Sequence, residues 1–316
     1  MRVTRGLSTN RTGSTRAALA ALTIGNFDGV HLAHRAMLER TVEAAADLQL
    51  CPTVLTFHPS PKEFFAGASG SPVAPRLSSL STKLQKFRET GIEHVVIAQF
   101  TAALSRLTPD EFVSSVLEAH LGIRWLLVGD DFHFGYKRAG SIATLRAAKT
   151  FTVEQMNTMM IDGHRVSSTA VRAALQNGAL DVAANLLGQP FAICGRVAHG
   201  EKLGRTLGFP TANLPLRFTP PLSGICAVRI DGLGDAPRYG VASLGVRPTV
   251  NPLARPVLEV FVFDFDQPIY GRRIKVSFLH KLRDEAKYAD LETLKAQIRR
   301  DADAARAYVE QLEKAA

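Results

Sequence analysis

The stretch "ALTIGNFDGVHLAHRAM" (residues 21–37) decides the fold of the first half of the chain. An apolar run ends at Gly25, a turn with a second glycine follows, and a helical pattern of apolar residues then runs from His34 to Leu48. A buried strand joined to an amphipathic helix in this way is typical of the repeating unit of a parallel α/β sheet. His31 and His34 stand three positions apart where the helix begins. That spacing is compatible with half of a metal site, with a phosphate site, or with a structural pair.

The same alternation of strand and helix patterns continues to residue 129. Apolar runs at 53–57, 94–100 and 124–129 predict strands, patterns at 81–91 and 108–122 predict helices, and the Pro/Ser/Gly-rich stretch 59–79 predicts a loop. The strands lack polar alternation, which indicates a doubly wound parallel sheet with both faces covered. Ligands of such sheets bind at the carboxyl ends of the strands, where the turn 25–29 and the segment "GDDFHFG" (129–135) lie.

The sequence pattern changes near residue 190, from alternating strands and helices to short strand-like runs. Two short helices are predicted at 166–178 and 179–188, each closed by a glycine. From 191 onward, short alternating runs broken by Gly and Pro predict an antiparallel sheet or small barrel, followed by a helix at 290–313 that Asp290 caps. The predicted domains are therefore 1–186 and 187–316.

Composition narrows the classes of partner. The 316 residues exceed one ordinary core, so two domains are expected. The net charge of +9 favours acidic partners, but it is scattered without a block of like charges, which favours small phosphate-bearing ligands over nucleic acid.

Cysteine usage and hydropathy exclude further classes. The three cysteines lie far apart without a CxxC pair, which argues against a zinc site or a disulfide framework. No run of about 18 apolar residues predicts a membrane span, and the apolar part of the basic N-terminal segment is too short for a signal peptide. A cytoplasmic location is expected.

The position of the two histidines favours phosphate chemistry among the three alternatives. A metal site needs three or four ligands, and no further Cys/His cluster is in register with them. A helix N-terminus offers free N–H groups and a positive dipole end, and imidazoles add donors for a phosphate. Such a site can hold an α-phosphate under in-line attack without a covalent intermediate.

The segment "GNFDGVHLAH" (25–34) resembles the HxGH signature of the nucleotidyltransferase superfamily, in the form found in prokaryotic FAD synthetases. One position departs, because Ala33 stands where the family has Gly. The resemblance implies an α/β Rossmann-like nucleotidyltransferase domain with catalytic histidines His31 and His34. It also implies nucleotide-binding roles for four residues of the turn: Gly25, Phe27, Asp28 and Gly29.

Two later segments resemble motifs of the same family. "RVSSTAVR" (165–172) is similar to its SSTxIR motif, which implies triphosphate contacts by Ser168 and Thr169 and a catalytic role for Arg172; read alone, it predicts a helix cap and a solvated arginine. "VGDDFHFG" (128–135) resembles the segment that lines the nucleotide and flavin site, which implies roles for Asp131 and Phe132. Read alone, that segment is a solvated turn.

One further segment departs from the family pattern. "TFHPSPKEFF" (56–65) has His58 and Ser60 where the family has other residues.

The loop "GRVAHGEKLGRTLGFPTANL" (195–214) combines glycines, basic residues, Thr and Asn. Backbone N–H groups and cations in such a loop suit a triphosphate, and neutral oxygens suit its Mg²⁺, although an ordinary loop has similar composition. The segment resembles the riboflavin kinase signature GxxxGxxxGxxLGFPTAN. The resemblance implies that Thr211 and Asn213 are Mg–ATP ligands and that six residues bind ATP: Gly200, Lys202, Gly204, Arg205, Gly208 and Pro210.

Glu259 begins the alternating run "LEVFVFDF" (258–265) and shares the face of Phe261 and Phe263. A carboxylate there is either a liability at a buried edge or a positioned base. In riboflavin kinases, which this segment resembles, the matching glutamate takes the proton of the ribityl 5′-hydroxyl as it attacks the γ-phosphate. "HKLRDEAKY" (280–288) resembles the flavin-side segment of that family, with Arg283 as the candidate.

The motifs arrive in the order found in prokaryotic bifunctional riboflavin kinase/FAD synthetases, over residues 20–313. The resemblance implies that riboflavin is phosphorylated to FMN by a C-terminal β-barrel, and that FMN is adenylylated to FAD with release of pyrophosphate. ATP is then the co-substrate and Mg²⁺ the cofactor, with no nucleic-acid or membrane partner. Two alternatives stay open: a riboflavin kinase with an impaired first domain, and a non-catalytic flavin- or nucleotide-binding regulator. The sequence leaves the oligomeric state open.

Overall fold

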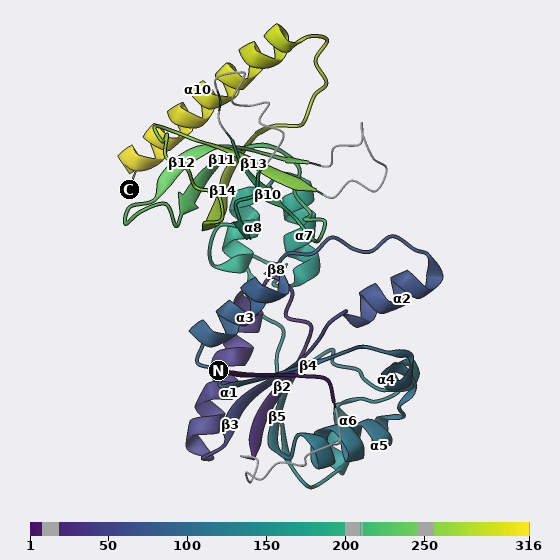
Figure 1. Cartoon of the computed structure of the whole chain (residues 1–316). Helices are drawn as coiled ribbons and strands as arrows, with labels where there is room; N and C mark the ends of the chain where they lie inside the picture. Colours follow the sequence, from purple (N-terminus) through teal and green to yellow (C-terminus); the bar gives the residue numbers. More distant parts are fainter. Residues whose placement is uncertain (8–18, 200–208, 210, 246–255, 316) are drawn as a thin grey trace. The chain divides into compact units, whose positions relative to one another are not determined.

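The computed structural model describes residues 1–7, 19–199, 209, 211–245 and 256–315 (Figure 1). The chain forms two compact units. Unit 1 comprises Met1–Ala74 and Leu80–Val166, and unit 2 comprises Pro75–Ser79 and Ser167–Ala316. A short piece of the first half of the sequence therefore belongs to the second unit.

Unit 1 is built on a six-stranded sheet in which every neighbouring pair is parallel, in the order β1-β4-β3-β2-β5-β6. The strands are β1 (Arg2–Arg5), β2 (Ala20–Ile24), β3 (Cys51–Phe57), β4 (His94–Ala98), β5 (Ile123–Gly129) and β6 (Thr152–Met156). The predicted doubly wound fold is confirmed. Chain order reverses between β2 and β5, so the carboxyl ends of these two strands form the crevice where such sheets bind ligands.

The helices and the small hairpin of unit 1 follow a strand–helix alternation. They are α1 (Leu32–Asp47), α2 (Pro61–Ser69), α3 (Leu80–Glu89), α4 (Ala102–Arg106), α5 (Pro109–Glu111), the π-helical η1 (Phe112–His120), the 3₁₀ turn η2 (Tyr136–Arg138), α6 (Ile142–Ala147), β7 (Met160–Ile161) and β8 (His164–Arg165). Helices cover both faces of the sheet (Figure 1). Leu22 packs with Leu117 of η1 on one face, and Val54 packs with Leu38 of α1 on the other.

The loop expected at 59–79 contains helix α2, so that expectation is wrong in part. Ser60 and Glu63 form a reciprocal capping box: Ser60 N–H donates to Glu63 Oε2 at 2.8 Å, and Glu63 N–H donates to Ser60 Oγ at 3.3 Å. Pro61 occupies the first helical position, which suits its fixed φ. Local capping therefore outweighs the loop-like composition.

Unit 2 begins with α7 (Ser168–Gln176) and α8 (Leu180–Leu187) and continues as a six-stranded antiparallel sheet in the order β10-β13-β12-β11-β14-β9. The strands are β9 (Ala192–Arg196), β10 (Thr211–Pro215), β11 (Gly224–Asp231), β12 (Arg238–Gly245), β13 (Val257–Val262) and β14 (Arg273–Arg283). Ala198 N–H donates to the Asn213 carbonyl at 2.8 Å, which brings the chain after β9 against β10 and nearly closes the barrel. The predicted barrel is confirmed, with β10 as a strand in a segment that the sequence pattern treated as loop.

The final helix, α10 (Leu291–Ala315), covers the barrel (Figure 1). Asp290 caps it as predicted, since its Oδ1 accepts from Thr293 N–H at 2.7 Å. Phe261 of β13 and Phe263, the residue after this strand, pack with Ala305 of this helix, which places the odd-numbered positions of β13 on the helix-covered face.

The two units part at a different place from the predicted sequence domains. Helices α7 and α8 belong to unit 2, and α8 packs against β14. The limits 1–186 and 187–316 assign these helices to the first domain, and those limits stay a prediction.

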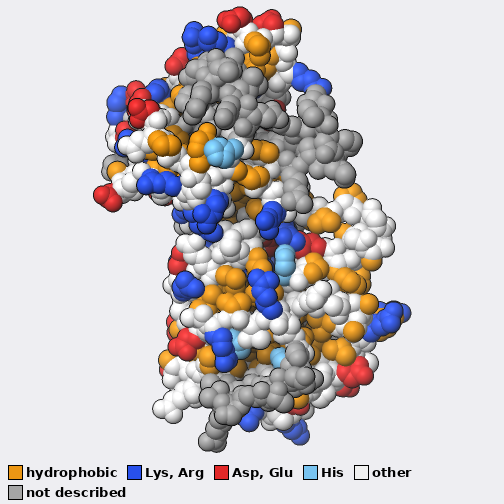
Figure 2. Space-filling view, viewed as in Figure 1, with side chains coloured by type: hydrophobic (Ala, Val, Ile, Leu, Met, Phe, Trp, Pro, Cys, Tyr) orange, Lys and Arg blue, Asp and Glu red, His pale blue; other side chains and the backbone are white. Residues whose placement is uncertain are grey.

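Charged side chains are dispersed on the face shown in Figure 2, where Lys and Arg lie singly or in small groups among hydrophobic and uncharged side chains. In the described ranges, no helix has both the length and the apolar character needed to cross a membrane.

Candidate active sites

The turn that follows β2 is strained and buried. Phe27 and Val30 have φ of 50° and 48°, and both side chains are fully buried. A left-handed conformation costs a residue with a side chain roughly 1–2 kcal/mol, so packing must hold it. The Phe27 ring meets Phe87 of α3 edge-on at 5.4 Å, and a Cβ at Gly25 would lie 3.1 Å from the Phe27 ring. Gly25 is therefore needed for the close approach of this ring to the backbone.

Two lysines of α3 hold the same turn. Lys83 Nζ donates to the Asn26 carbonyl at 2.6 Å, and Lys86 Nζ donates to the Gly29 carbonyl at 2.8 Å. Lys83 is only 9% exposed, and lysine is rarely buried without a partner. The sequence pattern did not single out these residues; the available signal was two lysines on one face of an otherwise ordinary amphipathic helix.

His31 and His34, predicted together, lie together at the N-terminus of α1. His31 is the N-cap residue, and its Nδ1 accepts from His34 N–H at 3.3 Å. The two rings stack with centroids 3.6 Å apart, and the His34 ring also packs on Phe27 at 5.0 Å. Within the described residues, the buried Nδ1 of His34 has no hydrogen-bond partner. The pair thus borders the free N–H groups of a helix start.

His34 is held neutral at pH 7. Its burial and the positive charges that His31, Lys83 and Lys86 can carry lower the pKa of this imidazole well below the ordinary 6.5. A neutral imidazole has one N–H donor and one acceptor nitrogen. His34 is therefore suited to hydrogen bonding more than to acting as a fixed cation.

Acidification should destabilise unit 1 through His34. Below pH 6.5 the unfolded chain binds a proton at this imidazole and the folded chain does not, so the free energy of unfolding falls as the pH is lowered. The slope contributed is at most about 1.4 kcal/mol per pH unit. Urea unfolding can be measured at pH 7.5 and 5.5 by the fluorescence of Trp125 in β5. Between these pH values, the free energy of unfolding should fall less for His34→Gln than for the wild type. The exposed His133→Gln is the control; an equal loss in all three proteins would contradict the assignment.

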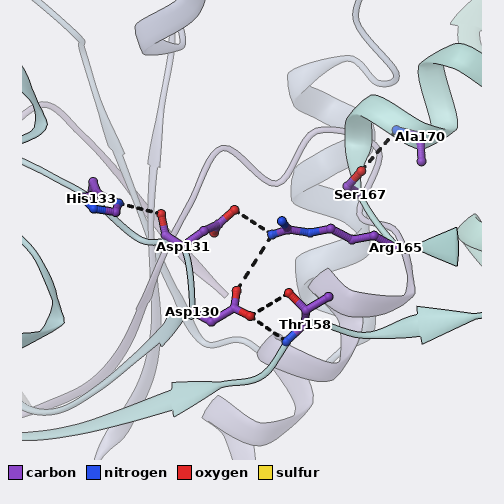
Figure 3. Close-up of polar contacts among 7 residues, drawn as sticks. All are labelled: Asp130, Asp131, His133, Thr158, Arg165, Ser167 and Ala170. Carbon is purple, nitrogen blue, oxygen red and sulfur yellow. Dashed lines mark hydrogen bonds and ion pairs between the residues drawn. The ribbon is translucent and has the colours of Figure 1, made fainter.

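The segment after β5 forms a polar cluster beside the predicted crevice (Figure 3). Arg165 Nη2 pairs with Asp131 Oδ2 at 2.6 Å. Asp130 Oδ2 accepts from both the N–H and the hydroxyl of Thr158, at 3.0 and 2.6 Å, and the hydroxyl bond is the main cause of its lowered pKa. The predicted Phe132 stacks on Phe134 with centroids 5.7 Å apart. The sequence pattern therefore located this segment but missed Arg165 and Asp130.

An aromatic cluster stands at the ends of β3 and β4. Phe57, Phe64, Phe65 and Phe100 contact one another with centroids 5.4–5.8 Å apart, and Phe65 of α2 is 54% exposed. An exposed ring backed by half-buried rings offers a surface on which a planar aromatic ligand can stack. The Phe64–Phe65 pair in the sequence was its only signal.

The predicted Ser/Thr/Arg motif lies in unit 2. Ser167, one of three candidates for the cap of α7, is the N-cap residue, and its Oγ accepts from Ala170 N–H at 3.1 Å (Figure 3). Ser168 and Thr169 therefore begin the helix. Arg172 Nε donates to the Pro75 carbonyl at 2.8 Å, within the same unit.

Thr211, Asn213 and Glu259 meet on one face of the barrel. In the antiparallel register, Asn213 of β10 and Ser243 of β12 both lie directly opposite Glu259 of β13, and Thr211 lies opposite Phe261. Directly opposite side chains share a face, with Cβ atoms about 5 Å apart. The hydroxyl, amide and carboxylate oxygens gathered here are the donors that Mg²⁺ prefers. The six predicted ATP-binding residues of the loop lie outside the described residues. Phe209, which is described, packs edge-on against Phe261 with ring centroids 5.3 Å apart.

A hollow of about 180 Å³ opens beside Thr211. It is lined in part by the segment 265–270 that precedes β14. Tyr270 of this segment stacks on His199 with ring centroids 3.9 Å apart. The hollow is therefore lined by an aromatic ring as well as by Thr211.

Comparison with known proteins matches both halves of the chain. The FAD synthetase family model matches residues 14–170, and the riboflavin kinase family model matches residues 187–309. The bifunctional riboflavin kinase/FMN adenylyltransferase of Haemophilus influenzae is 44% identical over 293 residues, covering 91% of this chain and 94% of that protein. The chain belongs to the bifunctional riboflavin kinase/FMN adenylyltransferase family.

Two further proteins of the same name are similar over most of the chain. The Escherichia coli K12 protein is 45% identical, with 91% of this chain and 92% of that protein covered, and the Pseudomonas fluorescens protein is 44% identical, with 97% of each covered. A crystal structure described as a macrolide-efflux protein from Streptococcus pneumoniae has a TM-score of 0.79 at 26% identity, with 96% of this chain and 98% of that chain covered. The family resemblance and the two-part fold expected from the sequence are confirmed.

Arg283, the family's flavin-side candidate, is held by α10 in this member of the bifunctional riboflavin kinase/FMN adenylyltransferase family. Its Nε and Nη2 donate to the two carboxylate oxygens of Asp301 at 2.8 and 2.6 Å, and this hydrogen bonding raises the pKa of the guanidinium. Asp301 is 6% exposed and also accepts from Gln297. A flavin contact by Arg283 stays a prediction.

Removing one partner of that pair should cost stability. Asp301→Ala leaves a partly buried guanidinium without its carboxylate, and we expect the free energy of unfolding of unit 2 to fall by about 3 kcal/mol. The control is Asp264→Ala, which breaks a second bidentate pair, between Asp264 and Arg306, in which the Asp264 carboxylate is 75% exposed. It should cost much less, because water screens an exposed pair. Urea unfolding followed by circular dichroism compares the two, and equal losses would show that burial does not set the difference.

Proposed function

We propose that the two activities of this family are divided between the two units, with FMN adenylylation in unit 1 and riboflavin phosphorylation in unit 2. The chain is an enzyme with riboflavin kinase and FMN adenylyltransferase activities. Relatives at 44–45% identity that cover more than nine-tenths of the chain carry both activities in their names. That similarity favours two working sites over a kinase with an impaired first domain and over a non-catalytic regulator.

In unit 2, the face that carries Thr211, Asn213 and Glu259 is the kinase site. Glu259 accepts the proton of the ribityl 5′-hydroxyl while that oxygen attacks the γ-phosphorus of ATP and ADP leaves. Enzymes that use ATP in this way typically need a divalent metal, which neutralises charge on the phosphates. We assign this ion as Mg²⁺, with Thr211 and Asn213 as the residues that hold it, because their oxygens are hard donors. The register of β10 and β13 is the observation that carries this assignment.

In unit 1, the crevice beside β2 is the adenylyltransferase site. The start of α1 and the imidazoles of His31 and His34 bind the phosphates of ATP. The FMN phosphate oxygen attacks the α-phosphorus, the bond from that phosphorus to the bridging oxygen breaks, and pyrophosphate leaves. The exposed aromatic cluster around Phe65 supplies a stacking surface for the flavin ring. The phosphate contacts implied for Ser168, Thr169 and Arg172 stay predictions.

Riboflavin, FMN and ATP fit the family as substrates. We place the protein in the cytoplasm, because ATP is available there. We propose no nucleic-acid or membrane partner.

The test is a time course with riboflavin, ATP and Mg²⁺, with the flavins separated by chromatography. FMN that appears first and is then converted to FAD is the expected result. Accumulation of FMN without FAD would support the alternative of an impaired first domain. Flavin binding without either product would support the regulator.

A further inference from the structure

We propose that Lys83 and Lys86 of α3 are positioning residues of the adenylyltransferase site, which fix two peptide groups of the turn between β2 and α1 so that their N–H groups face the nucleotide. This inference rests on the proposed function of unit 1. Neither lysine belongs to a motif that the sequence resemblance covers.

The two contacts bracket the turn. Lys83 and Lys86 lie three residues apart, on one face of α3, and their ammonium groups reach the carbonyls of Asn26 and Gly29, which are also three residues apart. Each contact spans 57 positions of sequence. The hydroxyl of Thr56 at the end of β3 also donates to the Asn26 carbonyl, at 3.4 Å.

Because a peptide group is planar, holding its carbonyl oxygen also fixes the direction of its N–H. The Asn26–Phe27 and Gly29–Val30 peptide bonds are trans, since the cis bond of the described chain is His58–Pro59. In a planar trans peptide, the N–H points opposite to the carbonyl. With both carbonyls held toward α3, the N–H groups of Phe27 and Val30 point away from α3. Backbone N–H groups fixed on one side of a turn form a binding concavity for an anion.

The ammonium groups of Lys83 and Lys86 also lower the pKa of the His34 imidazole. The titratable or charged groups that shift the His34 imidazole are His31 on its own helix and the two lysines on α3, and burial acts in the same direction. Removal of a lysine therefore changes two separate properties, the orientation of the turn and the proton affinity of His34. A lysine that only stabilised the fold would leave KM for ATP unchanged in a protein that remains folded, although loss of its charge would still raise the pKa of His34.

The experiment compares Lys83→Met and Lys86→Met with the wild type in the full-length chain. Arg88→Met is the matched control, because it removes a positive charge from an exposed residue of the same helix. The readouts are kcat and KM for ATP in the conversion of FMN to FAD, and the pKa of the His34 imidazole from NMR, with His34→Gln to assign the resonance. Trp125 fluorescence reports whether unit 1 is folded.

We expect KM for ATP to rise about tenfold for each lysine variant, as for loss of a charge-assisted hydrogen bond, with a smaller change in kcat. The pKa of His34 should rise in both variants, and Arg88→Met should match the wild type in both readouts. If Lys83→Met does not fold, the half-buried Lys86→Met still decides the proposal.

Unchanged KM for ATP in a folded Lys86→Met protein would overturn the inference, whatever the change in the His34 titration. If the wild type makes no FAD from FMN, the proposed function of unit 1 fails instead. Binding of ATP to the same variants, measured by calorimetry, then decides the role of the lysines without turnover: weaker binding supports it and equal binding overturns it.

Discussion

Glu259→Gln stops the formation of FMN from riboflavin and leaves the conversion of FMN to FAD at the wild-type rate. The substitution keeps the size and one oxygen of the side chain but removes the group that accepts the 5′-hydroxyl proton. Loss of a positioned general base typically costs 10²–10⁴-fold, so we expect at least about a hundredfold fall in kcat for FMN formation. Separate assays that start from riboflavin and from FMN measure the two steps.

The control for this prediction is Glu310→Gln. Glu310 lies on α10, its side chain is exposed, and it belongs to no motif of the proposed kinase site. The Glu310→Gln protein should retain both activities. Loss of both activities in a folded Glu259→Gln protein would contradict the assignment of the two reactions to separate sites.

His31→Asn should have the opposite effect, with FAD formation strongly reduced and FMN formation retained. Asparagine is a favourable N-cap residue, so α1 keeps a side-chain acceptor for the His34 N–H while the imidazole is lost. Removal of one donor to a developing charge costs about 10²–10³ in kcat, and we expect a fall in that range. Chromatographic rates of FAD formation from FMN and ATP measure it.

Arg35→Gln is the matched control for His31→Asn. Arg35 lies one turn later on α1 in a surface ion pair with Glu39, and both side chains are exposed, at 43% and 54%. Its loss should leave both rates near those of the wild type. A His31→Asn protein with the wild-type rate of FAD formation would remove this histidine from the reaction.

Local patterns of the sequence were enough to predict the elements that carry both sites. The apolar run that ends at Gly25, the helix after His31 and the alternation around Glu259 all appear in the structure where they were expected. Alternation also placed Glu259 on the face of Phe261, and the burial of β13 alternates in that way, with both residues half-buried between buried neighbours. These features depend on residues a few positions apart, so the sequence displays them directly.

The features that were missed have physical reasons. Strands β1 and β6 lie at the edges of the sheet and have no buried residue, so they lack the apolar run that marked the central strands. Helix α2 is defined by a two-residue cap instead of an apolar stripe. The contacts of Lys83 and Arg165 join residues distant in sequence, and no local pattern encodes which carbonyl or carboxylate they will meet.

The segment Pro75–Ser79 has a consequence for how this chain can be divided. Its Arg76 N–H donates to the Thr219 carbonyl and its Pro75 carbonyl accepts from Arg172, so these five residues are structural parts of a unit whose remainder begins at Ser167. Proteolysis at a single bond cannot separate the two units with both intact, because their residues are interleaved in the sequence. A shortened chain that begins at residue 167 lacks the carbonyl that holds Arg172. During synthesis, Pro75–Ser79 leaves the ribosome before Arg172 and Thr219, so its contacts with them form only after those residues have been made.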